Sequence, residues 1–251
     1  MRMVSFLKRI SSFRRTVDNV RLGELILKLS DFHIKQYQCP KPIADKLRQS
    51  LIDCEGTILD LPGETTHRYP KDTITGKMNY YNLVRDEETW FTYGLPFIKE
   101  IVVEYLSLKP DEEVAIKAWG NILRMDRKVF PHRHFGVPDD WVENKQSVCG
   151  NIFLGAEVAT DTTYILDGDK VDIPNVYGQF TLFPPNISHA VRTYKGEGVR
   201  VSAAFDTLVT SRDKEGKVTG KNWMTWVHQK HQQQFFAVPT KDKNNDNFNQ
   251  A

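Results

Sequence analysis

The chain has 251 residues, of which 34 are Lys or Arg and 32 are Asp or Glu, so its formal net charge is +2. This near balance excludes a protein that relies on a strong basic field to hold nucleic acid or an anionic membrane. Hydrophobic residues make up 40% of the chain, enough for a packed core, and no apolar run approaches the roughly 20 residues that span a bilayer. The three cysteines, Cys39, Cys54 and Cys149, have the spacing of neither a disulfide framework nor a metal site, which favours a cytoplasmic protein.

Helical patterns dominate the first part of the chain. Residues 1–15 are basic and predict an amphipathic helix rather than a secretory signal, because charged residues interrupt the apolar stretch. Residues 32–39 alternate as a strand does, and Pro42 is suited to the first turn of the helix that follows. Residues 87–108 predict a further helix, interrupted at 94–96 by Gly-Leu-Pro. The apolar residues expected to face the core from these two helices are Ile43, Leu47, Leu51, Ile52, Ile98, Ile101, Val102 and Tyr105.

After Pro110 the pattern changes to short strands, rich in β-branched and aromatic residues and separated by turn sequences such as Gly168-Asp169. The strands are expected at residues 114–125, 148–154, 162–166, 180–183 and 199–205. Such closely spaced strands predict an antiparallel sandwich or barrel, and the preceding helices are expected to cover one sheet face, which makes the fold class α+β. Trp119, Tyr164 and Phe183 are assigned to the core of this barrel.

We expect a single domain over residues 1–240. Its helical part covers about 1–110 and its barrel core about 111–235. Residues 241–251 are polar, rich in Asn and almost free of apolar side chains, so they cannot contribute to a core. This tail is predicted to be disordered.

Three of the seven histidines form a pattern that suits a metal ion. His132 and His134 are two residues apart, shortly after a strand, and His189 follows a second strand and a Pro-Asn turn. Side chains two apart on an extended segment project to the same side, and a third imidazole from a neighbouring strand would close a triangular face on a metal. Taken alone, a His-x-His at the end of a strand is more often a surface feature than a metal site. The sequence downstream is therefore needed to choose between these two interpretations.

That context is an Arg-x-Ser pair on the strand after His189. Strand alternation places Arg200 and Ser202 on the face opposite to Val201. In its ordinary role, Arg200 would be an exposed cation or pair with an acid such as Asp206. In a binding role, its guanidinium would hold a carboxylate, with the Ser202 hydroxyl on the same face.

This order of motifs resembles the Fe(II)- and 2-oxoglutarate-dependent oxygenase superfamily. The similarity covers roughly residues 112–208, and residues 119–206 also look like phage and bacterial oxygenases related to prolyl 4-hydroxylase. In that family two histidines and usually a carboxylate bind iron, and an Arg with its Ser binds the distal carboxylate of 2-oxoglutarate. The resemblance therefore implies a double-stranded β-helix, a jelly-roll or cupin-like barrel, flanked by N-terminal helices.

The resemblance also implies a site and an activity. Iron ligands are expected among His132, His134 and His189, and 2-oxoglutarate ligands at Arg200 and Ser202. Two further candidates lie on strands beside the expected pocket, where they would hold the cosubstrate or orient a ligand histidine: Asn121 and Asn151. The implied activity uses Fe(II), 2-oxoglutarate and O2 to hydroxylate an unidentified small-molecule or peptide substrate, with release of succinate and CO2.

The chain departs from the family at the proximal motif, which is usually His-x-Asp or His-x-Glu. If His132 is the proximal ligand, His134 stands at the carboxylate position and the centre has three nitrogens. If His134 is the ligand, Gly136 stands there, a pattern similar to aspartyl/asparaginyl β-hydroxylases and to iron halogenases. We favour a three-His or two-His iron centre, in which bound 2-oxoglutarate supplies the anionic character that the missing carboxylate would have given.

Two other functions remain open. A cupin-type metalloprotein, either a 2-oxoglutarate-independent dioxygenase or an isomerase, shares the barrel, and the segments around His134 and His189 are similar to the two cupin motifs. A catalytically inactive barrel with a structural or assembly role is the second alternative, supported by the missing proximal carboxylate. Arg200 and Ser202 discriminate among these, because a cupin does not require them.

Overall fold

The structure is a computed structural model, and it describes residues 29–63, 70, 72–109, 112–134, 147–211 and 236–239. The helix expected at 1–15 and the tail at 241–251 lie outside the described residues.

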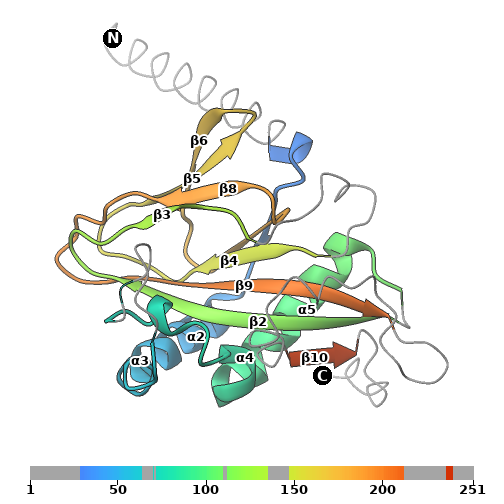
Figure 1. Cartoon of the computed structure of the whole chain (residues 1–251), viewed down its shortest axis with the longest axis horizontal. Coiled ribbons are helices and arrows are strands. Elements are labelled where there is room, and N and C mark those ends of the chain that lie inside the picture. Colours follow the sequence, from blue (N-terminus) through green and yellow to red (C-terminus); the bar gives the residue numbers. More distant parts are fainter. Residues whose placement is uncertain are drawn as a thin grey trace, which may run out of the picture.

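Two antiparallel sheets face each other over much of the molecule (Figure 1). Within the described residues, the larger sheet has the order β1-β7-β4-β9-β2-β10 and the smaller has the order β3-β8-β5-β6. The strands of the larger sheet are β1 (Lys35–Gln38), β2 (Glu112–Leu123), β4 (Cys149–Phe153), β7 (Gln179–Phe183), β9 (Arg200–Ser211) and β10 (Phe236–Pro239). Those of the smaller sheet are β3 (Val129–His132), β5 (Asp161–Leu166), β6 (Asp169–Pro174) and β8 (Ser188–Val191). The five expected strands correspond to β2, β4, β5, β7 and β9, with ends shifted by one to several residues.

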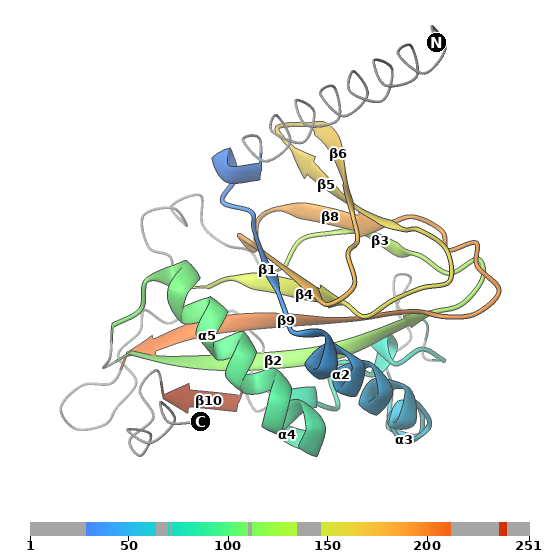
Figure 2. The ribbon, with the colours of Figure 1, turned by 180° about the vertical axis from the view of Figure 1, so that it is seen from behind.

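Most of the described helices lie on the side of the larger sheet that faces away from the smaller one (Figure 2), whereas a short helical turn at residues 29–31 packs with the smaller sheet. This arrangement confirms the expected α+β architecture. The labelled helices are α2 (Lys41–Asp53), α3 (Glu55–Leu59), α4 (Leu83–Asp86) and α5 (Leu95–Leu106), with a 3-10 turn, η1 (Thr75–Lys77), and a π-helical turn, η2 (Trp90–Gly94). The expected interruption at 94–96 is wrong as a break, because η2 runs directly into α5 and Pro96 occupies its first turn, where a missing N–H breaks no helical hydrogen bond. None of the described helices is long and apolar enough to span a membrane.

The main hydrophobic core lies between these helices and the larger sheet. Leu47 and Leu51 of α2 and Ile98 and Val102 of α5 are fully buried in it, as the periodicity predicts. At Gly120 of β2 the helical layer approaches the strand so closely that a Cβ would lie 2.4 Å from Cδ1 of Leu51. The glycine thus permits the helix-on-sheet packing.

The opposite face of the larger sheet looks toward the smaller sheet and carries polar side chains in rows. The strand register of β2, β9 and β4 aligns one row of Lys117, Asp206 and Cys149, a second of Trp119, Ala204 and Asn151, and a third of Asn121, Ser202 and Phe153. Arg200 stands opposite Leu123 at the next position of this face. The residues that the sequence proposes for cosubstrate binding are therefore brought onto one surface inside the barrel.

Candidate metal centre

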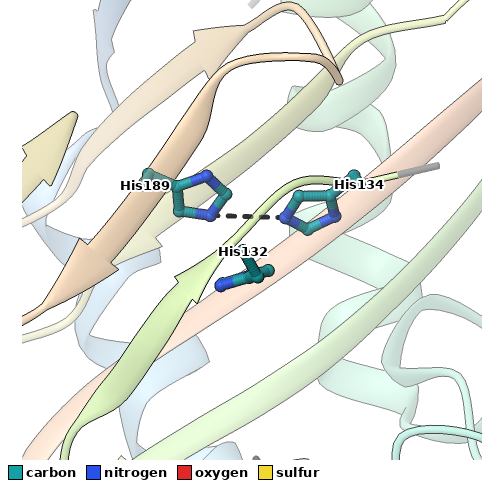
Figure 3. A group of neighbouring side chains, drawn as sticks. All are labelled: His132, His134 and His189. Carbon is teal, nitrogen blue, oxygen red and sulfur yellow. Dashed lines mark hydrogen bonds between the residues drawn. The ribbon is translucent and has the colours of Figure 1, made fainter. Parts of the chain in front are cut away.

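Three imidazoles converge between the two sheets (Figure 3). His132 is the last residue of β3, His134 lies two residues beyond it, and His189 in β8 stands opposite His132 in the strand register. One nitrogen of each ring lies within 4.8 Å of a nitrogen of the other two. His134 and His189 are buried, whereas His132 is partly exposed. The structure thus brings together all three histidines that the sequence singles out.

The hydrogen bonds at Nδ1 decide which nitrogen of each ring is available to a metal. Nδ1 of His132 lies 2.8 Å from the carbonyl oxygen of Phe130, and Nδ1 of His189 lies 3.2 Å from that of Ile187. A carbonyl oxygen only accepts hydrogen bonds, so in both rings Nδ1 carries the proton and Nε2 keeps its lone pair. Imidazoles that bind metals are held in this way, with the second ring nitrogen donating to an oxygen.

The geometry of the nitrogens fits a metal ion. Nε2 of His134 and Nε2 of His189 lie 3.3 Å apart. Bonds from imidazole nitrogen to a metal are about 2.1 Å long, so two nitrogens that share an ion lie about 3 to 3.5 Å apart. Burial, with His134 and His132 nearby, also holds the pKa of His189 well below its ordinary value, which keeps this imidazole neutral. Neutral imidazoles are the form in which histidine binds iron.

A carboxylate completes the surroundings of His134. Asp206, expected only as an ion-pair partner of Arg200, instead places Oδ1 2.7 Å from Nδ1 of His134. Burial opposes ionisation of this carboxyl, but His134, Cys149 and Lys117 together hold its pKa below the ordinary value. The third imidazole therefore has a charged group in close contact at Nδ1, where the other two have carbonyl oxygens. Strand alternation carried a signal for this residue, since Asp206 shares a face with Arg200 and Ser202.

The imidazoles line a cavity that is partly open to solvent. Its walls include the three histidines and all four residues proposed for the cosubstrate: Asn121, Asn151, Arg200 and Ser202. Trp119 belongs to the main core cluster, as expected, but it also lines the cavity and stacks on His134 with ring centres 5.8 Å apart. Tyr164 and Phe183 are buried in a core cluster, as expected, although both rings face His189.

Arg200 is the buried cation of this cavity, with only 3% of its surface exposed. Its Nη1 donates to the hydroxyl oxygen of Ser202 at 2.9 Å, and its plane lies over the ring of Phe153. Its buried Nε has no hydrogen-bond partner in the described part of the chain. Burial lowers the pKa of the guanidinium to about 10, which still leaves it charged at neutral pH. A buried guanidinium with an unused N–H fits a carboxylate ligand, since such a charge is stable only when paired.

Neighbouring polar groups hold the two asparagines in the cavity wall. The hydroxyl of Thr75 donates to Oδ1 of Asn121 at 2.7 Å, which links η1 to the barrel. The Tyr164 hydroxyl is hydrogen-bonded to the side chains of Asn151 and Thr181. The sequence did not predict a role for Thr75, because this residue lies far from the barrel strands along the chain.

No protein-family model matches the chain, and no curated protein shows significant similarity to it. Solved structures do match. The non-heme monooxygenase ThoJ in its apo form has a TM-score of 0.53 and 11% identity, over 74% of this chain and 79% of that one. The non-heme α-ketoglutarate-dependent epimerase SnoN, from nogalamycin biosynthesis, has a TM-score of 0.52 and 10% identity, over 78% and 86%. A prolyl hydroxylase from Trichoplax adhaerens, solved with a hypoxia inducible factor peptide, has a TM-score of 0.50 and 11% identity, over 77% and 92%.

At such low identity the likeness concerns the fold. The chain shares the double-stranded β-helix fold of these solved structures, with helices flanking the barrel, as expected. Because one fold can serve several chemistries, the activity has to be argued from the site.

Proposed function

We propose that the protein is an Fe(II)- and 2-oxoglutarate-dependent oxygenase with His132, His134 and His189 as its metal ligands. One observation carries this proposal: three imidazoles whose ligand nitrogens lie within 4.8 Å of one another share a cavity with Arg200, a buried guanidinium whose Nε has no hydrogen-bond partner in the described residues. A cupin-type metal site accounts for the imidazoles but gives no reason to bury Arg200. A purely structural barrel accounts for neither feature.

When bound, iron and 2-oxoglutarate would supply the oxidising chemistry, in which O2 is consumed, succinate and CO2 are released and the substrate is hydroxylated. The chain's own residues hold and orient these groups. The Nδ1 contacts to Phe130, Ile187 and Asp206 keep the three rings turned with Nε2 toward the shared ion.

Arg200 and Ser202 are positioned to hold the far carboxylate of the cosubstrate. The Nε–H of Arg200 has no partner in the described residues and can donate to that carboxylate. Ser202 holds the guanidinium in place by accepting a hydrogen bond from Nη1. Asn121 and Asn151 add amide groups to the wall between Arg200 and the imidazoles. Trp119 covers His134 with an apolar ring, which limits water around the reacting groups.

The test is to add Fe(II) and 2-oxoglutarate, without oxygen, to the purified full chain. A weak visible charge-transfer band, together with raised thermal stability, is the expected result, because the keto acid chelates the ion. Metal binding without an effect of 2-oxoglutarate would favour the cupin alternative. Absence of the band with unchanged thermal stability would favour the inactive barrel.

A further inference from the structure

We propose that Asp206 is a positioning residue that supplies, through His134, the negative charge that the missing His-x-Asp carboxylate would have placed directly on the metal. This inference rests on the proposed function, since it concerns affinity for the metal. The contact between Asp206 and His134 is a property of the metal-free protein and is tested separately below.

The three imidazoles are not equivalent in what they donate to. His132 and His189 donate from Nδ1 to backbone carbonyls, which are neutral. His134 alone, among the three, has a carboxylate at Nδ1, and the two atoms are 2.7 Å apart. A carboxylate at this position raises the basicity of the opposite nitrogen and strengthens its bond to a metal. The effect of Asp206 is therefore directed at one ligand.

Charge balance explains why a carboxylate is needed at this position. Three neutral imidazoles leave both positive charges of Fe(II) uncompensated, whereas the related enzymes usually have a carboxylate among the ligands. Asp206 is 6% exposed, and burying a carboxylate costs several kcal/mol unless it is paired. Lys117 stands beside it in the strand register, but its amino group is hydrogen-bonded to Oδ1 of Asn79. A cation bound by His134 would add a second positive charge near Asp206, beside that of Lys117.

A separate metal site built from His134, Cys149 and Asp206 is the competing interpretation, because their ligand atoms also lie within 4.8 Å of one another. Binding there would require His134 to lose its Nδ1 proton and Cys149 to ionise. Burial and the neighbouring carboxylate raise the pKa of the Cys149 thiol well above its ordinary value, which opposes that ionisation. None of the cavity-lining residues other than His134 belongs to this group.

The first measurement is the affinity of Asp206→Asn for Co(II) and for anaerobic Fe(II), compared with the wild type. Asparagine keeps the shape and an accepting oxygen but removes the charge, so we expect affinity to fall about 10- to 100-fold. The matched control is Asp172→Asn, which removes an acid that contacts Thr163 and Arg192 in the smaller sheet. Its affinity should equal that of the wild type. Equal affinity in Asp206→Asn would overturn the inference, and a second bound equivalent of metal in the wild type would support the competing site.

The second measurement asks whether Asp206 acts through His134. If it does, adding Asp206→Asn to His134→Ala should cause no further loss of metal affinity, because the shared interaction is already gone. If the double variant instead loses as much metal affinity relative to His134→Ala as Asp206→Asn loses relative to the wild type, Asp206 acts directly on the ion. That result would overturn the positioning role.

The third measurement needs no metal and no variant. Nitrogen-15 NMR of histidine-labelled wild-type protein should show the His134 proton on Nδ1. A proton on Nε2 would refute the contact even if Asp206→Asn failed to fold. A wild type that binds no metal would instead refute the proposed function, and with it this role. Metal binding that is unchanged in a folded Asp206→Asn variant would refute the inference alone.

Discussion

Nε2 of His134 and Nε2 of His189 face each other at 3.3 Å, although 55 positions separate the two residues in the chain. Nδ1 of His189 lies beside the carbonyl oxygen of Ile187 and Nδ1 of His134 lies beside the carboxylate of Asp206, so a ring with its proton on Nδ1 turns its Nε2 lone pair toward the other ring. A proton or a metal ion shared between the two Nε2 atoms would offset the repulsion between such lone pairs. This pair of atoms is the structural basis for the predictions about metal binding.

Replacing His189 with Ala should abolish metal binding, because it removes one of the two buried ligand nitrogens. The measurement is a titration with Co(II) under conditions where the wild type binds. His33→Asn is the matched control, since His33 is an exposed histidine with φ 56°, a conformation that asparagine tolerates. Tight binding by His189→Ala would contradict the proposed ligand set.

The variants His132→Ala and His134→Ala decide between two and three histidine ligands. Since the three ligand nitrogens lie within 4.8 Å of one another, we expect both variants to lose most of the wild-type affinity. The same Co(II) titration checks this. A loss confined to His134→Ala would show a two-His centre in which His132 takes no part.

Replacing Arg200 with Ala should preserve metal binding and weaken 2-oxoglutarate binding. Hydrogen bonds to charged groups contribute about 1.5–3 kcal/mol, which corresponds to a loss of roughly 10- to 150-fold in cosubstrate affinity. The measurement is a titration of the visible band with 2-oxoglutarate in anaerobic, iron-loaded protein. The control is Arg192→Ala, because Arg192 is an exposed arginine paired with Asp172. An unaltered affinity in Arg200→Ala would refute its role.

Replacing Gly120 with Ala should destabilise the fold by about 1–3 kcal/mol, as overpacking of a core does. The added Cβ would lie 2.4 Å and 2.7 Å from side-chain atoms of Leu51 and Ile74, both of which are buried. Gly56→Ala is the control, because a Cβ at Gly56 in α3 meets nothing within 4 Å and alanine favours a helix. Chemical denaturation compares the two variants. Equal stability would mean that the helix-to-sheet packing is looser than the structure shows.

Burial lowers the pKa of Lys117 from its ordinary 10.5 to about 8, although Asp206 opposes the shift. Between these two pH values the unfolded chain holds this proton more firmly than the folded protein does, so this group's contribution to the free energy of unfolding rises with pH. Lys117→Met removes that dependence. We therefore expect the wild type to gain stability relative to Lys117→Met as the pH rises from about 8 toward 10.

Denaturation curves of both proteins across this range check the prediction, and taking the difference cancels the other titrating groups that both proteins share. Asn79, the Trp119 ring and Asp206, which face the Lys117 amino group in the wild type, are present in both proteins. A difference in stability that is constant with pH would show that Lys117 is solvated in solution.

Local patterns predicted much of the fold. The period-two alternation of β9 placed Arg200 and Ser202 inside the barrel and Val201 in the helix-covered core, as the structure has them. The pattern was weaker where strands are short and polar. It did not identify β3, which carries Pro131, a residue that weakens a strand prediction. The hairpin turn between β5 and β6 also begins earlier than expected, because positive φ angles fall at Asp167 and Gly168.

The sequence by itself determined which residue types are available for chemistry and which face of a strand they occupy, because alternation is a property of the local backbone. Only the tertiary structure decided that His134 meets His189. It also decided that Asp206 makes its close contact with His134 rather than with Arg200. Those distances depend on how β3, β8 and β9 approach one another across two sheets. Packing between sheets is set by side chains distant in the chain, so no spacing along the sequence reveals it.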